Sequence, residues 1–256
     1  FARIAPRGNS HNNGESTKMA QHRLFDQLSM RIVAVAPLCP PMTVAHICQA
    51  FAMIGKEHEE LFAVFSDRLR TSKDEFPAIV IGAILDAFAQ LGIRDDTLFI
   101  EMIPRVRLVA QYGTPRDIAN VVAAYTGVGL WHYKLFAKLA DRVIVMRGQC
   151  RPTEIVKILK AYGAVKMRYD KLFLELSPRI QTLAHLLSPA DVCDIIESYA
   201  LVEVFESGLF TVLADRIVAL QEQFEPQQWE RLSVSLMPAN LQNEELTKCL
   251  AAHRTA

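Results

Sequence analysis

An arginine recurs along the chain at a constant spacing of 37 residues. The six positions are Arg31, Arg68, Arg105, Arg142, Arg179 and Arg216. Guanidinium groups at one repeated position could form a ladder that contacts successive phosphates without regard to base sequence. The alternative is structural, because a residue present in every unit commonly serves the contact between units. An aspartate precedes the arginine in alternate units, at Asp67, Asp141 and Asp215. This regularity favours the structural interpretation.

A second set of candidate contacts consists of residue pairs, three positions apart, that recur with the same period. The successive pairs are His46 and Gln49, Ala83 and Asp86, Asn120 and Ala123, Lys157 and Lys160, and Asp194 and Glu197. In α-helical repeat proteins that bind RNA, exposed positions that differ between repeats read successive bases. Any solvent-exposed face would vary as much, and the acidic members would repel phosphate. The candidate RNA contacts are therefore Lys157, Lys160, Asn120, His46, Gln49, Arg68, Arg105, Arg142 and Arg179.

Three consecutive ring-bearing residues, Trp131, His132 and Tyr133, fall between two predicted helices. The equivalent positions of the other full units are mostly charged. Exposed aromatic side chains in a loop indicate a protein contact or a stacked base, and local packing explains them equally well.

The sequence contains no motif for catalysis or metal binding. There is no glycine-rich phosphate loop and no nucleophile elbow. The five cysteines have no CxxC spacing, which favours reduced thiols, and no finger or HExxH pattern of metal ligands occurs. Lys plus Arg and Asp plus Glu are both 28, so the whole surface does not serve as a phosphate platform. We expect no enzyme activity, cofactor, metal or small-molecule substrate, and no apolar run of about 18 residues that would span a membrane.

A Leu-Phe pair recurs six residues before each arginine and defines the elements that position these side chains. The phenylalanines are Phe25, Phe62, Phe99, Phe136, Phe173 and Phe210. A unit repeated at this period stacks on its neighbours to bury its apolar face. The sequence therefore predicts an all-α, right-handed α-solenoid with a 37-residue period.

Each unit reads as two amphipathic helices. Prolines mark the predicted starts of the first helices, at Pro41, Pro115, Pro152, Pro189 and Pro226, with Pro77 one place early. Proline suits the first helical position because its fixed φ matches the helix and its missing N–H would be unpaired there. The stripe of each first helix includes an aromatic column, at Phe51, Phe88, Tyr125, Tyr162 and Tyr199, beside a column of small residues. The second helix carries the Leu-Phe pair and the arginine.

The predicted organisation is one solenoid over residues 21–256, preceded by an irregular segment over residues 1–20. A lone second helix over residues 22–36 comes first, five full helix pairs follow over about 41–225, and a degenerate capping pair covers 226–253. The segment 1–20 has three basic residues and one acidic residue. That composition suits the end of a mitochondrial import sequence, and a plain irregular start fits as well. The start at Phe1 and the unpaired helix over residues 22–36 lead us to expect either preceding sequence or a partner that packs against this end.

These columns resemble the heptatricopeptide-type repeats and their octotricopeptide and Fas-activated-kinase-like (RAP-type) relatives. The resemblance covers about residues 22–237 and rests on the Leu-Phe pair and arginine of the second helix and the Ala-aromatic pair of the first. It implies a mitochondrial matrix protein of RNA processing, RNA stability or ribosome assembly. No C-terminal RAP domain is recognisable, which argues against a nuclease-like function or one at RNA ends.

Two functional hypotheses follow. The first is a non-catalytic RNA-binding component of mitochondrial RNA processing, RNA editing or the mitoribosome. The second is a protein scaffold in a large mitochondrial assembly without direct RNA contact. Clustered lysines on the concave side would favour the first hypothesis, and an exposed apolar patch at the N-terminal edge or near Trp131 would favour the second.

Overall fold

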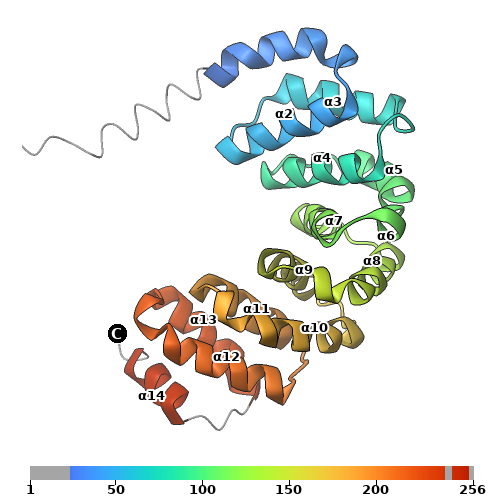
Figure 1. The fold of residues 1–256 in the computed structure, drawn as a ribbon. Coiled ribbons are helices and arrows are strands. Elements are labelled where there is room, and N and C mark those ends of the chain that lie inside the picture. Colours follow the sequence, from blue (N-terminus) through green and yellow to red (C-terminus); the bar gives the residue numbers. More distant parts are fainter. Residues whose placement is uncertain (1–23, 240–243, 254–256) are drawn as a thin grey trace, which may run out of the picture.

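The computed structural model describes residues 24–239 and 244–253. Within these ranges all regular elements are helices, and they stack into a curved two-layered array (Figure 1). The expected all-α helical-repeat solenoid is confirmed. The expected irregular segment 1–20 lies outside the described residues.

The first helices form the inner layer of the curve (Figure 1). They are α2 (Pro41–Ile54), α4 (Ala78–Gln90), α7 (Pro115–Gly127), α9 (Pro152–Ala164), α11 (Pro189–Leu201) and α13 (Pro226–Leu236). Their first residues are 37 positions apart, and each packs along the next first helix in the chain. The first helices thus make one continuous concave wall.

The second helices form the outer, convex layer (Figure 1). They comprise a helix over residues 24–35, α3 (Glu59–Thr71), α5 (Asp96–Val106) with α6 (Val109–Tyr112), α8 (Tyr133–Val145), α10 (Asp170–Leu183), α12 (Ser207–Ala219) and α14 (Glu244–His253). We number the five full helix pairs from α2 and α3 as units one to five. The helix over 24–35 packs through Phe25 against Phe51 of unit one, with ring centroids 4.9 Å apart.

The helix ends follow from local sequence. Proline is the first residue of five first helices, whereas α4 begins at Ala78 and leaves Pro77 at the N-cap. Thr114 and Ser188 accept hydrogen bonds from the third amides of α7 and α11, as their position before proline indicates. Three first helices end near glycines with positive φ, Gly55, Gly92 and Gly129. Lys166 and Glu203 adopt positive φ at the same place in units four and five.

The core is built from the repeated aromatic columns. Every Leu-Phe pair from Leu61 to Phe210 is at most 2 % exposed. In units three to five the tyrosine hydroxyl of the first helix donates to the backbone carbonyl of the phenylalanine in the preceding second helix. These bonds are Tyr125 to Phe99 (2.7 Å), Tyr162 to Phe136 (2.6 Å) and Tyr199 to Phe173 (2.7 Å). The phenylalanines and tyrosines are therefore core residues and do not form platforms for stacked bases.

Unit two departs from the expected single second helix. α5 ends at Val106, and the short helix α6 follows it. At the same place, a 3-10 turn follows the helix over 24–35 and also follows α8, α10 and α12. Gly113 follows α6 at the position of the buried Phe76, Cys150 and Leu187 in other units. A Cβ on Gly113 would lie 2.6 Å from the carbonyl oxygen of Val109. The glycine therefore permits the close approach of α6, and Val109 is buried there.

Candidate nucleic-acid interface

Most of the arginine column holds neighbouring units together. Arg105 donates to the carbonyl of Phe76 (2.9 Å), Arg179 to that of Cys150 (3.1 Å) and Arg216 to that of Leu187 (2.8 Å). Arg68 donates to the carbonyl of Ala36. Each acceptor lies in the segment that enters the arginine's own unit, so these guanidinium groups satisfy loop carbonyls. The hydrogen bonds support the structural interpretation for these four residues.

Among the column's arginines in the five full units, Arg142 is the exception. Among the described residues its side chain makes no hydrogen bond or ion pair, and its Nε atom is buried without a partner. The corresponding carbonyl would belong to Gly113, in the segment that α6 reshapes. Arg142 instead lines a hollow on the convex side with Arg107 and Lys138.

The concave candidates are engaged with acidic side chains. Lys157 Nζ lies 2.9 and 2.7 Å from the two carboxylate oxygens of Asp86 and 3.0 Å from the amide oxygen of Asn120. Asp86 is only 7 % exposed. Burial raises the pKa of its carboxyl above the ordinary value, and Lys157 opposes that rise. The structure thus brings Asn120 and Lys157 together around a buried carboxylate.

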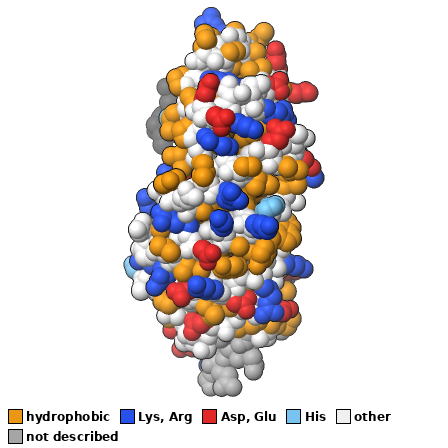
Figure 2. All heavy atoms as spheres, turned by 90° about the vertical axis from the view of Figure 1, so that its right-hand side faces the viewer, with side chains coloured by type: hydrophobic (Ala, Val, Ile, Leu, Met, Phe, Trp, Pro, Cys, Tyr) orange, Lys and Arg blue, Asp and Glu red, His pale blue; other side chains and the backbone are white. Residues whose placement is uncertain are grey.

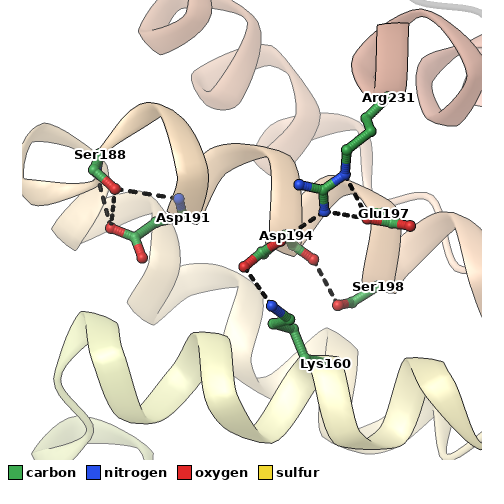
Figure 3. Close-up of polar contacts among 7 residues, drawn as sticks. All are labelled: Lys160, Ser188, Asp191, Asp194, Glu197, Ser198 and Arg231. Carbon is green, nitrogen blue, oxygen red and sulfur yellow. Dashed lines mark hydrogen bonds and ion pairs between the residues drawn. The ribbon is translucent and has the colours of Figure 1, made fainter. Parts of the chain in front are cut away.

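A second charge cluster continues along the concave wall towards the C-terminus (Figure 3). Lys160 Nζ lies 2.8 Å from Asp194 Oδ2, and Arg231 Nη2 lies 2.7 Å from Asp194 Oδ1. Arg231 also pairs with Glu197. The two concave lysines therefore face carboxylates, and phosphate would compete with these pairs.

His46 and Gln49 lie farther along the concave wall, in a hollow of about 430 Å³ that spans α2, α4 and α7. The small side chain of Ala83 lies in its lining, together with Asp86 and Asn120. Exposed apolar side chains share this end of the molecule. They are Met42, Met53 and Ile79.

The three loop residues that the sequence nominated as a group have different roles. His132 is the N-cap of α8, and its Nδ1 accepts from the amide of Leu135 at 3.3 Å. His58 caps α3 in the same way at 3.2 Å, and Asp95 and Glu206 cap α5 and α12. These four capping residues are separated by 37 residues or a multiple of 37. We did not predict this capping column from the sequence. Trp131 and Tyr133 are 51 and 61 % exposed and remain the contact candidates.

Charge is unevenly distributed along the solenoid, although the chain is neutral overall. Residues 105–183 contain 14 Lys and Arg against 5 Asp and Glu, whereas residues 184–256 contain 4 against 11. Figure 2 shows Lys and Arg gathered around the middle of the convex face. Counting charge by segment would have revealed this basic centre, which the whole-chain balance conceals.

Four cations form what we call the convex basic surface: Arg107, Lys134, Lys138 and Arg142. Three of them follow one another at four-residue spacing along α8, so they lie on one side of that helix. Within the described part of the chain none of the four forms an ion pair. The neighbouring Asp141 accepts a hydrogen bond from the Tyr169 hydroxyl at 2.8 Å. Arg107, Lys134 and Lys138 are exposed and Arg142 is partly buried. Cations without a carboxylate partner are available to phosphate.

The described ranges also bear on metal binding and on membrane-spanning helices. Residues 24–239 and 244–253 contain no group of three His, Cys, Asp or Glu that could hold a metal ion. In the same ranges, no helix has the length and apolar character needed to cross a bilayer. All five cysteines are free thiols.

The fold and this surface define a helical-repeat protein with a central basic region. Comparison with protein families then specifies the group. The chain matches the family of the RNA-editing substrate-binding complex 6 protein over residues 16–169 and 151–256, and it belongs to this family. Membership makes it a component of the mitochondrial RNA-editing machinery. No curated protein matches the chain.

Proposed function

We propose that this protein is a non-catalytic subunit of an RNA-editing substrate-binding complex in the mitochondrial matrix and that it contacts RNA directly. The contact is made by the convex basic surface. The observation that carries the proposal is the excess of 14 basic over 5 acidic residues in 105–183, with four convex cations free of carboxylate partners among the described residues. The repeat type is the heptatricopeptide-like one that the Leu-Phe and Ala-aromatic columns suggest.

Such a surface recognises the phosphate backbone and is largely indifferent to base sequence. Each phosphate neutralised on a single strand contributes about 0.7 to the slope of log affinity against log salt. Exposed Trp131 and Tyr133, at the start of α8, could add base stacking to the phosphate contacts.

The concave residues His46, Gln49, Asn120, Lys157 and Lys160 are a weaker RNA site. Binding there requires phosphate to displace Asp86 from Lys157 or Asp194 from Lys160. Partly desolvated pairs of this kind are costly to break, because the carboxylate is left without its counter-charge.

The test is a pair of charge-matched double variants. Lys134→Gln with Lys138→Gln removes two cations from the convex basic surface. Lys73→Gln with Lys248→Gln removes two exposed lysines outside that surface, one in the turn after α3 and one in α14. Affinity for a single-stranded oligouridylate is measured against salt. We expect the convex variant to lower the salt slope by about 1.4 relative to wild type and the control to leave it nearly unchanged. Equal slopes for the two variants, or no binding by wild type at low salt, would overturn the proposal.

The second candidate is a protein scaffold without RNA contact. It is favoured by exposed apolar side chains at the N-terminal edge, in the helix over 24–35, the turn after it and α2. They are Met30, Val35, Leu38, Met42 and Met53. Ultraviolet crosslinking of the native complex distinguishes the two, because a scaffold would yield no RNA-linked peptide from this chain.

A further inference from the structure

The unpartnered side chain of Arg142 lies in unit three, whose entering segment contains α6 and Gly113. Arg105, Arg179 and Arg216 each donate to a carbonyl 29 residues earlier in the chain. The same offset from Arg142 leads to Gly113, which directly follows α6. Because Gly113 has no side chain to bury, α6 packs through Val109 instead, and Arg142 makes no bond to this segment.

The freed guanidinium lines an open hollow of about 430 Å³ between α6 and α8. The other polar groups around it are Arg107, Gln111, Lys138 and Asp141. Three cations and one amide thus surround a single carboxylate, and one oxygen of that carboxylate already accepts from Tyr169. The hollow has a net positive charge and several hydrogen-bond donors.

The combination of cations does not recur in the other full units. The positions equivalent to Lys138 hold Val64, Glu101, Glu175 and Val212. The positions equivalent to Arg107 hold Val33, Arg70, Ile144 and Gln181, and Arg70 is paired with Asp95 at 2.6 Å. Only at α8 does a partnerless arginine coincide with two further cations among the described residues.

We propose that this hollow is a phosphate-binding site and that its occupant is a backbone phosphate of RNA. The planar guanidinium of Arg142 binds two phosphate oxygens, an arrangement to which arginine is better suited than lysine. Lys138 and Arg107 add point charge from α8 and from the turn before α6. The inference rests on the proposed function and assigns its central contact to one unit of the solenoid.

The experiment compares Arg142→Gln with Arg179→Gln in the full chain. Both variants lose one arginine of the column, but only the first lies in the hollow. We expect Arg142→Gln to weaken oligouridylate binding about tenfold or more, as the loss of a charged hydrogen-bonding group implies. Arg179→Gln should bind as wild type does, and Arg142→Lys should recover only part of the affinity. Circular dichroism melting checks that each variant is folded.

Inorganic phosphate is the second probe. In wild type it should shift the nuclear magnetic resonance signals of the Arg142 guanidinium, and it should not shift those of the Arg179 guanidinium. If wild type binds RNA and Arg142→Gln binds equally well, the hollow is not the contact, and the proposed function stands. If phosphate binds in the hollow but wild type binds no RNA, the RNA occupant and the proposed function both fall. Should Arg142→Gln not fold, Arg107→Gln with Lys138→Gln replaces it, with the same outcomes.

Discussion

Lys157 and Asp86 are 71 residues apart in the chain, yet Lys157 Nζ lies 2.7 Å from Asp86 Oδ2. The pair connects α9 to α4 across α7, where Asn120 supplies a third group at 3.0 Å. It therefore ties three successive first helices together on the concave wall. Lys157, which we nominated from the sequence as an RNA contact, is therefore part of this connection between helices.

Replacing Lys157 by methionine should destabilise the fold, because Asp86 would remain buried without its counter-charge. We expect a loss of about 2 kcal/mol in the free energy of unfolding, measured by urea denaturation. Lys160→Met is the control, since the Lys160 side chain is 55 % exposed and Arg231 also neutralises Asp194. Its cost should stay below about 1 kcal/mol. Equal costs for the two variants would show that the buried pair adds nothing.

The cost of Lys157→Met should shrink as the pH falls. Burial raises the pKa of Asp86 above its ordinary value of 3.8, so the folded state binds the proton more tightly than the unfolded chain does. Protonation then favours folding, and loss of the proton as the pH rises through the folded pKa removes that contribution. Without Lys157 the pKa rises further. The difference in unfolding free energy between wild type and variant should therefore decrease as the pH falls from neutral to about 4. A difference that stays constant over this range would contradict the expectation.

Two arginines of the same column should differ in their effect on stability. Arg179→Gln removes the bond to the Cys150 carbonyl and should cost about 1–2 kcal/mol. Arg142→Gln removes no hydrogen bond among the described residues and should leave the melting temperature close to that of wild type. Differential scanning calorimetry measures both. A larger loss for Arg142→Gln than for Arg179→Gln would refute the structural assignment of the column.

Tyr162→Phe should cost about 0.5–1.5 kcal/mol, the usual contribution of one hydrogen bond. The hydroxyl donates to the Phe136 carbonyl at 2.6 Å, while the ring would keep its packing. Phe51 and Phe88 occupy the same column in units one and two, so phenylalanine fits this place. Chemical denaturation measures the cost, and a change above about 3 kcal/mol would mean that packing is lost as well.

The thiols should divide into two classes of reactivity. Burial raises the pKa of Cys150 to about 11 and that of Cys193 to about 12, and it raises that of Cys48 further. Cys39 and Cys249 are only partly buried. Because the thiolate is the reactive form, a disulfide reagent at mildly alkaline pH should titrate two thiols rapidly in the native protein and all five after unfolding. Five rapid thiols in the native protein would contradict the buried assignment.

Much of the architecture could be predicted because it is local and repeated. Some residues act within a single helix end, so the residue type alone indicates the structural role. These are the prolines, the positive-φ glycines and the caps Thr114 and Ser188. The burial of the Leu-Phe pairs follows from the same repetition, since a column that is apolar in each unit faces the neighbouring units. The capping role of His132 is equally local, and the recurrence of a side-chain acceptor at His58 and Asp95 could have revealed it.

The candidate site was less predictable because it depends on relations between units. The sequence alone specified the recurring arginine, the recurring Leu-Phe pair and the two helices of each unit, because each of these depends on neighbours a few residues away. Only the tertiary structure decided which charges are free. Curvature brings Asp86 within reach of Lys157 two units later, and the missing side chain at Gly113 changes the segment that Arg142 would otherwise contact. Hydrogen bonds of this kind depend on ångström-scale distances between separate units, which a periodic pattern does not encode.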